Sequence, residues 1–274
     1  MNKFPISDQL PETQVAIEAV IEAGKVVMEV YYKNFLSSTK SDNEPITEAD
    51  IKSNNSIKNI ISSCGHLILS EESPDDKSRL AHKKIWIVDP LDGTTDFVKK
   101  TGEFTIMIAL VENNKPILGI IYWPIKKQLF LAQKGRGAFQ LNDGNWKKIS
   151  VSTISEINNC RAVGSRHHIS EKEHDLLELL KISKFTSKGS SLKVTDISSG
   201  TAELYFTTAN KIKQWDTCAS YCLITEAGGK MTDMFGNDLK YNTERLNHEN
   251  GLLVSNGLIH NHIIKIYRES MNNN

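Results

Sequence analysis

The chain has 274 residues, of which 39% are hydrophobic and 24% are charged, the balance of an ordinary soluble globular protein. Its 33 basic and 33 acidic residues leave a formal net charge of zero. A general nucleic-acid binder or a polybasic membrane protein needs an excess of positive charge, so the composition argues against both classes. No apolar run approaches the roughly 20 residues that span a bilayer, and the polar N-terminus does not resemble a signal peptide.

The cysteines are too sparse for a disulfide framework in a chain of this length. They are Cys64, Cys160, Cys218 and Cys222. The last two lie four residues apart and would share one face of a helix. We interpret them as small core residues rather than metal or redox groups. A reducing, cytoplasmic setting is therefore predicted.

The first half predicts two helices followed by a β-rich region. Apolar residues recur at helical spacing over 13–35, which predicts a first helix. A second helix is expected to begin after Pro45 and to end at Gly65. The expected strands are 67–69, 85–88, 104–111, 117–123 and 128–132. The second of them should stop at Asp89 and Pro90, because proline cannot continue the ladder. The last three strands, with short turns between them, predict a meander.

The second half alternates strands and helices. The expected strands are 161–164, 204–207 and 251–255, and the expected helices are 170–180, 190–199, 216–227 and 259–267. Gly228 and Gly229 should end the third of these helices. The pattern predicts an α/β (α+β) fold with sizeable antiparallel sheet, rather than a doubly wound parallel sheet. No linker separates the halves, 1–148 and 149–274, so they are expected to pack as one unit.

Three carboxylates are predicted at the ends of apolar strands, Glu71, Asp89 and Asp92. Carboxylates in such places are costly unless a cation neutralises them. Together with the carbonyl of Leu91 they offer the oxygen ligands that Mg²⁺ prefers. Residues 93–95 supply backbone N–H groups at a turn or helix start, where a phosphate can bind. The pattern predicts a metal and phosphate site, although an acidic surface turn would also fit it.

Two further carboxylates are ambiguous by themselves. Asp216 begins an apolar helix directly after Trp215, where aspartate is commonly an N-cap. Asp50 lies in the first turn of the helix after Pro45, where acidic residues are favoured by the helix dipole. Spacing alone does not distinguish these roles from a role in chemistry.

Five segments carry a family resemblance in the same order along nearly the whole chain. They read Thr-Glu-Ala-Asp at 47–50, Leu-Ser-Glu-Glu-Ser at 69–73, Asp-Pro-Leu-Asp-Gly-Thr-Thr-Asp-Phe at 89–97, Gly-Glu-Phe-Thr at 102–105, and Trp-Asp with a later Ala-Gly-Gly at 215–229. They resemble the signatures of the inositol monophosphatase superfamily of lithium-sensitive, Mg²⁺-dependent phosphatases. The resemblance implies a layered α-β-α-β-α sugar-phosphatase fold with mixed, largely antiparallel sheets.

The resemblance also implies a set of metal ligands and a catalytic group. Two or three Mg²⁺ ions would be bound by Glu71, Asp89, the carbonyl of Leu91, Asp92 and Asp216. Glu71 and Thr94, whose hydroxyl Asp50 would hold, would orient the attacking water, and Glu71 would take its proton. The N–H groups of Gly93 and Thr94 would stabilise charge on the phosphate oxygens.

Within the superfamily, two segments resemble the 3′(2′),5′-bisphosphate nucleotidases of the CysQ type. They are Gly-Ser-Arg-His-His at 164–168 and Gly-Ser-Ser-Leu-Lys at 189–193. A solvated loop fits the first segment equally well, and a surface position fits Lys193. The chain departs from this branch at 210–214, where it has Asn-Lys-Ile-Lys-Gln instead of Gly-Pro-Thr-Met-Glu, which bears on the exact substrate. The implied substrate-binding residues are Glu71, Leu91, Asp92, Gly93, Thr94, Ser165, His167, Gly189, Ser190, Lys193 and Asp216.

The predicted reaction is hydrolysis of adenosine 3′,5′-bisphosphate to AMP and phosphate, as part of sulfur metabolism. The expected partner is this small phosphorylated substrate, without a nucleic-acid polymer or stable membrane insertion, and the expected state is a monomer or homodimer. An inositol or broad sugar monophosphatase is the alternative enzyme. A non-catalytic sensor of phosphorylated metabolites is the alternative from another class, and the intact catalytic set argues against it.

Overall fold

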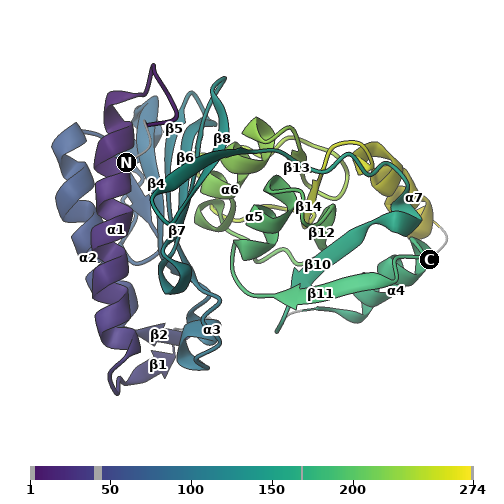
Figure 1. Ribbon diagram of the computed structural model, residues 1–274, viewed down its shortest axis with the longest axis horizontal. Coiled ribbons are helices and arrows are strands. Elements are labelled where there is room, and N and C mark those ends of the chain that lie inside the picture. The colour runs from purple at the N-terminus through teal and green to yellow at the C-terminus, as the bar shows by residue number, and fades with distance from the viewer. Residues whose placement is uncertain (1–3, 40–44, 168, 273–274) are drawn as a thin grey trace.

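The structure is a computed structural model that describes residues 4–39, 45–167 and 169–272. Its elements form five layers, helices on a sheet, a central pair of helices, a second sheet and a last pair of helices (Figure 1). The predicted α-β-α-β-α fold with mixed sheets is confirmed. Within the described ranges, no helix is long and apolar enough to cross a membrane.

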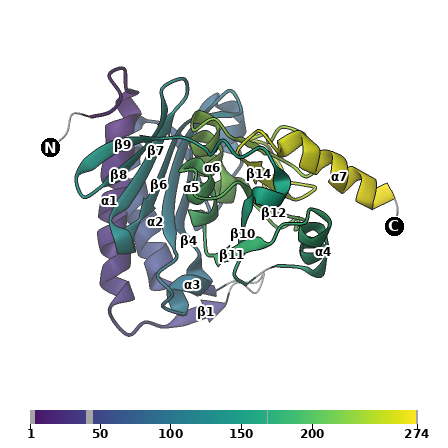
Figure 2. The same cartoon turned by 45° about the vertical axis from the view of Figure 1, so that its right-hand side comes forward.

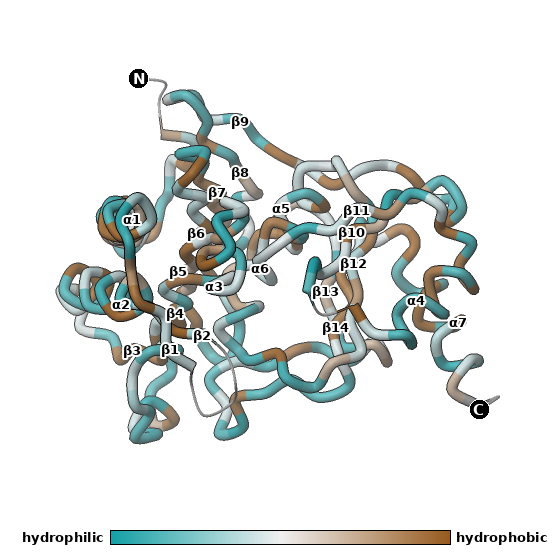
Figure 3. The backbone as a smooth tube through the Cα atoms, turned by 90° about the horizontal axis from the view of Figure 1, so that it is seen from below, coloured by the Kyte–Doolittle hydropathy of each residue, from teal (hydrophilic) through white to brown (hydrophobic). Residues whose placement is uncertain are grey.

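The first layer consists of α1 (Pro11–Tyr31) and α2 (Glu48–Ile61). Ala16, Val20, Ala23 and Val27 of α1 are fully buried, which is the helical spacing expected from the sequence. Seen nearly end-on in Figure 3, α1 carries both apolar and polar segments around its axis. A short hairpin of β1 (Ser37–Thr39) and β2 (Pro45–Thr47) joins the two helices.

The second layer is a seven-stranded sheet in the order β3-β4-β5-β6-β7-β8-β9. Its strands are β3 (Leu67–Ser70), β4 (Lys84–Asp92), β5 (Thr105–Glu112), β6 (Lys115–Trp123), β7 (Gln128–Gln133), β8 (Gly137–Asn142) and β9 (Asn145–Ile149). β3 and β4 are parallel, and each later pair is antiparallel. The predicted meander is therefore present, and β8 and β9 extend it beyond the prediction.

The prediction that the strand stops at Asp89 and Pro90 is wrong, because β4 continues to Asp92. The register shifts there, since Asp89 pairs with Met107 while Asp92 pairs with Thr105. Two residues of β4 therefore face one residue of β5, which is a β-bulge. A bulge accommodates a proline, because the residue there makes no regular ladder bond.

The central layer contains α5 (Leu192–Ser198) and α6 (Gln214–Glu226). The second sheet has the order β11-β10-β12-β14-β13, with parallel pairing of β10 to β11 and β12. Its strands are β10 (Arg161–Ser165), β11 (Lys184–Lys188), β12 (Leu204–Thr207), β13 (Lys230–Thr232) and β14 (Leu252–Ser255). α4 (Glu171–Leu179) and α7 (His260–Asn272) cover the side of this sheet that faces away from α5 and α6 (Figure 2).

α6 lies directly on the seven-stranded sheet. A Cβ atom added to Gly119 of β6 would come within 2.5 Å of the carbonyl oxygen of Ala219, so glycine allows this close approach. Burial raises the pKa values of Cys218 and Cys222 on α6, in agreement with their interpretation as core residues. The core between the sheets draws on both halves, while the division at residue 149 stays a prediction.

Two buried histidines make stability depend on pH. His248 Nε2 lies 2.8 Å from the hydroxyl oxygen of Thr217, and burial lowers the pKa values of His248 and His260 from 6.5 to about 4. The unfolded chain therefore binds protons below pH 6.5 that the folded chain rejects. The histidines do not lower the free energy of unfolding above pH 6.5, where both are neutral in the folded and the unfolded chain. As the pH decreases from 6.5 to 4, each histidine should lower the free energy of unfolding by about 3 kcal/mol.

Replacing His248 by glutamine should make stability depend less steeply on pH, because one of the two groups that bind a proton only in the unfolded chain is then absent. Urea unfolding of both proteins between pH 7 and pH 4 measures the effect. The exposed His174 of α4 offers a control, and His174→Gln should leave the slope unchanged. Equal slopes for the wild type and His248→Gln would show that this histidine is not the group that titrates.

Candidate active site

Three carboxylates converge where β3, β4 and α6 meet. Glu71 follows β3, Asp89 lies on β4 and Asp216 lies in the first turn of α6, and one oxygen of each lies within 4.8 Å of the others. Asp89 is 2% exposed, and its pKa is raised well above the usual value by burial and by the charges of Glu71, Asp92 and Asp216. Such a group is unfavourable without a cation. The residues present therefore fit a divalent metal ion with oxygen ligands.

The bulge in β4 fixes the orientation of these groups. The backbone N–H of Leu91 donates to Asp89 Oδ1 at 3.1 Å, and the hydroxyl of Ser53 on α2 donates to the carbonyl oxygen of Pro90 at 2.6 Å. Gly93 then turns the chain with φ of 92°, a conformation that favours glycine. The turn leads into α3 (Thr94–Val98), as expected for residues 93–95.

Thr94 and Asp50 are in contact, as the resemblance implies. The Thr94 hydroxyl lies 3.0 Å from Asp50 Oδ1 and 3.2 Å from the carbonyl oxygen of Leu91, so both are acceptors for its hydrogen. The other Asp50 oxygen accepts from the backbone N–H and the hydroxyl of Thr47, each at 2.7 Å. Burial raises the pKa of Asp50, and these hydrogen bonds oppose that rise. Asp50 therefore caps α2 and holds Thr94 at the same time.

Asp216 is not the N-cap considered from the sequence, because α6 begins at Gln214 and Lys213 is its N-cap. Its Oδ2 accepts from the backbone N–H of Lys213 at 2.7 Å, which completes a capping box, and the residue still belongs to the carboxylate group. Asp92 lies beside that group rather than within it. Its Oδ2 accepts from the backbone N–H of Ser191 at 2.5 Å, and burial raises its pKa while the charge of Lys193 lowers it.

Lys193 is buried, so the surface position considered from the sequence is wrong. It is 8% exposed, and burial lowers its pKa while the charge of Asp92 raises it. Its Nζ donates to the carbonyl oxygen of Ser190 at 2.7 Å and lies 5.2 Å from the ring centre of Tyr205. α5 begins at Leu192 rather than at Ser190, because Ser190 has φ of 49° in the left-handed region.

The segments at 164–167 and 189–193 meet at two acidic side chains that the sequence did not single out, Asp96 and Glu103. His167 Nε2 lies 3.4 Å from Asp96 Oδ1, and Arg166 Nη2 donates to Glu103 Oε2 at 2.6 Å. The backbone N–H of Gly189 donates to the same Glu103 oxygen at 2.7 Å. The segment 164–167 is therefore tied to α3 and its following loop, whereas His168 lies outside the described residues.

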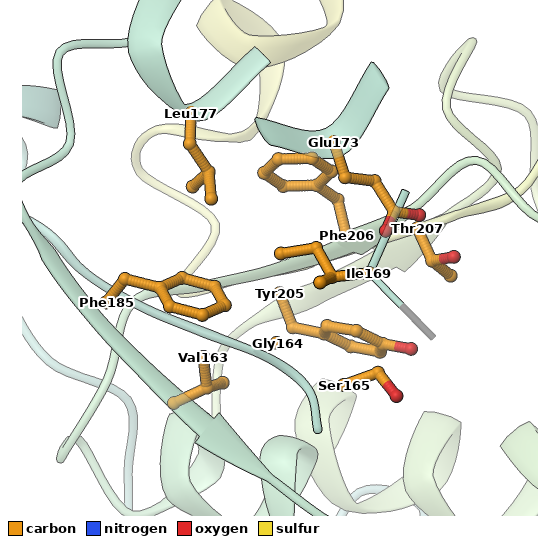
Figure 4. Close-up of a pocket in the computed structure, with 10 residues that line it drawn as sticks. All are labelled: Val163, Gly164, Ser165, Ile169, Glu173, Leu177, Phe185, Tyr205, Phe206 and Thr207. Atoms are coloured by element: carbon orange, nitrogen blue, oxygen red, sulfur yellow. The ribbon is translucent and has the colours of Figure 1, made fainter. Parts of the chain in front are cut away.

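A pocket opens near the ends of β10 and β12 (Figure 4). Side chains of Phe185, Tyr205 and Phe206 line it, and Ser165 stands at the end of β10. Because Tyr205 also faces Lys193, the pocket adjoins the site from the side of the second sheet. Ser165 is among the residues that line the pocket, whereas His167, Gly189, Ser190 and Lys193 are not.

Comparison with known proteins identifies the family. Residues 8–272 match the model of the inositol monophosphatase family. The chain belongs to this family. It is 38% identical over 229 residues to the 3′(2′),5′-bisphosphate nucleotidase CysQ of Buchnera aphidicola, with 80% of this chain and 83% of that protein aligned. It is 36% identical over 226 residues to the protein of the same name from Escherichia coli K12, covering 80% of this chain and 89% of that protein.

Solved structures agree with this result. The crystal structure of CysQ from Bacteroides thetaiotaomicron, a bacterial member of the inositol monophosphatase family, has a TM-score of 0.75 and 30% identity, covering 88% of this chain and 96% of that chain. The predictions of the superfamily, of its CysQ type and of a phosphoric monoester hydrolase are confirmed. The family is generally metal-dependent, which agrees with the carboxylate group.

Some site residues of this inositol monophosphatase family member could have been found from the sequence. Asp96 and Glu103 lie within the segments 89–97 and 102–105 that carry the resemblance. Tyr205 gave no signal, because an aromatic side chain on an apolar strand is typical of a core residue.

Proposed function

We propose that this enzyme removes the 3′-phosphate of adenosine 3′,5′-bisphosphate, giving AMP and phosphate, with two or three Mg²⁺ ions as cofactor. The similarity to CysQ nucleotidases over 80% of the chain is the observation that carries the proposal. The buried Lys193 supports it. A substrate with two phosphates needs a cationic group for the phosphate that is not hydrolysed, and Lys193 lies beside the carboxylates.

Glu71, Asp89 and Asp216 would hold the metal, with Asp92 and the carbonyl of Leu91 completing its ligands. Bound Mg²⁺ would supply charge stabilisation for the phosphate and lower the pKa of the attacking water. Asp92 keeps a hydrogen bond to α5, so it would link the metal side of the site to the substrate side.

The remaining chemistry falls to side chains that surround the metal ligands. Glu71 is half-buried and would accept the proton of the attacking water. Thr94 would orient that water, because Asp50 holds its hydroxyl in place. The backbone N–H groups of Gly93 and Thr94 would donate to the phosphate oxygens as negative charge builds up on them. Ser165, His167, Gly189, Ser190 and Lys193 would bind the rest of the substrate.

Replacing Lys193 by methionine should weaken binding of the bisphosphate more than binding of a monophosphate. Methionine keeps the length of the side chain and removes the charge. Loss of one charge-assisted hydrogen bond, about 1.5–3 kcal/mol, corresponds to a rise in KM of about 10- to 100-fold for adenosine 3′,5′-bisphosphate. Lys184→Met on the exposed start of β11 is the matched control. An equal rise in KM for inositol 1-phosphate would contradict a specific role for Lys193.

The test of the proposal is a comparison of three substrates. Phosphate release from adenosine 3′,5′-bisphosphate, inositol 1-phosphate and fructose 1,6-bisphosphate would be measured under the same conditions, with and without EDTA and lithium. We expect the highest kcat/KM for the nucleotide and inhibition by both additives. A clear preference for inositol 1-phosphate would reject the nucleotidase proposal in favour of a monophosphatase. A place in sulfur metabolism, a cytoplasmic location and a monomeric or dimeric state stay predictions.

A further inference from the structure

The connection between β3 and β4 is joined to the start of α6 by three buried polar side chains. Arg79 is 2% exposed, Gln214 1% and Asn242 7%. We propose that these three residues form a clasp that positions Asp216 against Glu71 and Asp89, and that they are therefore positioning residues for the metal site. The inference rests on the proposed metal binding but is independent of the nature of the substrate.

Arg79 connects the segment that follows Glu71 to the loop at Asn242. Its Nε and Nη2 donate to the two carboxylate oxygens of Asp75 at 3.0 and 2.9 Å, which fixes the guanidinium plane. Its Nη1 donates to Asn242 Oδ1 at 3.0 Å. Asn242 Nδ2 donates in return to the carbonyl oxygens of Arg79 and His82, at 3.2 and 3.0 Å. The oxygen and the NH₂ group of the Asn242 side chain therefore both bind the connection between β3 and β4.

Gln214 connects the same loop to α6. It is the first residue of the helix and lies two residues before Asp216. Its Oε1 accepts from the backbone N–H of Asn242 at 2.7 Å. Its Nε2 lies 2.8 Å from both the hydroxyl oxygen of Thr243 and the carbonyl oxygen of Arg245. A methionine is similar in length and shape but can neither donate to these oxygens nor accept from Asn242.

This arrangement matters because the carboxylates come from distant parts of the chain. Glu71 leaves β3 into the connection that Arg79 anchors, whereas Asp216 lies on a helix that follows the second sheet's strand β12. A small shift of α6 along the seven-stranded sheet would separate Asp216 from the other two ligands. Residues that orient metal ligands typically change metal affinity by about 10- to 100-fold when they are replaced. The clasp is buried, so its hydrogen bonds are protected from competition with water.

The chain provides a matched control between the same two segments. Lys77 and Glu244 form an ion pair at 2.8 Å, with side chains that are 55% and 73% exposed. An exposed pair of this kind contributes little. Lys77→Ala therefore breaks a contact between the same two segments without touching the clasp.

The test measures cation binding directly by titrating Mg²⁺ alone, and Mn²⁺ alone, into the full-length protein in a calorimeter. Gln214→Met removes the amide donors and acceptor at the start of α6, and Arg79→Lys keeps the charge but removes the planar fork. We expect the dissociation constant for the cation to rise about tenfold or more in both variants and to stay within about twofold in Lys77→Ala. Thermal unfolding without divalent cations shows whether each variant is folded, and Arg79→Lys decides the test if Gln214→Met does not fold.

Wild-type cation affinity in folded Gln214→Met and Arg79→Lys would overturn the clasp while leaving the proposed function intact. Absence of cation binding by the wild type itself would overturn the proposed metal site, and the clasp with it.

Discussion

Replacing Asp89 by asparagine is expected to lower kcat by about 10²–10³-fold and, at the same time, to stabilise the metal-free protein. The loss of activity follows from the loss of a charged ligand at the centre of the carboxylate group. The new side chain fits, because an asparagine oxygen still accepts from the backbone N–H of Leu91. The change therefore removes charge with little change of shape.

The gain in stability has a separate cause. Burial and the charges of Glu71, Asp92 and Asp216 raise the pKa of Asp89, so its ionised form is unfavourable in the folded protein at neutral pH. Thermal unfolding in EDTA should show a higher midpoint for Asp89→Asn than for the wild type, while Asp76→Asn on the exposed connection should leave activity unchanged and should not raise the midpoint. A variant with the wild-type kcat, or one with a lower midpoint in EDTA, would contradict this account of Asp89.

Asp50→Asn is expected to lower kcat by about 10²-fold while leaving cation affinity unchanged. Thr47 directs two donors at Asp50, and these would hold the carbonyl oxygen of the new side chain. Its NH₂ group would then face the Thr94 hydroxyl, which could no longer donate to residue 50. The hydroxyl that orients the attacking water would turn away from its position in the wild type.

Steady-state kinetics and calorimetric titration with Mg²⁺ separate the two effects. Glu48→Gln is the control, because Glu48 is exposed in the same first turn of α2. Wild-type kcat in Asp50→Asn would remove the contact between Asp50 and Thr94 from the mechanism. A large loss of cation affinity would instead make Asp50 a determinant of metal binding.

The carboxylate group was largely predictable because its members lie at the ends of strands with clear apolar patterns. β3 and β4 are parallel neighbours, so their carboxyl ends meet at one edge and bring Glu71 close to Asp89. The roles of Asp50 and Asp216 could not be read from spacing, since a helix-capping carboxylate looks the same whether or not its second oxygen has another partner. In this protein Asp50 and Asp216 both belong to capping boxes, while Asp50 also accepts from the Thr94 hydroxyl and Asp216 also lies in the carboxylate group.

Other features lacked a local signal. β9 and β11 have mostly exposed or half-buried side chains, so neither shows the apolar alternation that predicts a strand. The bulge at Pro90 depends on pairing with β5, which the sequence of β4 alone does not reveal. The sequence left Lys193 as either a surface residue or a phosphate contact, because lysine is rarely buried. Its burial depends on the nearby carboxylates and on the Ser190 carbonyl, which accepts from its Nζ.

Identification of the product tests the central claim most directly. Purified protein would be incubated with adenosine 3′,5′-bisphosphate and Mg²⁺, and the nucleotide product would be separated from adenosine 3′-phosphate and quantified together with phosphate. The account predicts AMP and phosphate in equal amounts, with no turnover in EDTA and with turnover lowered about 10²–10³-fold in Asp89→Asn. Release of the 5′-phosphate, or undiminished turnover in EDTA, would contradict it.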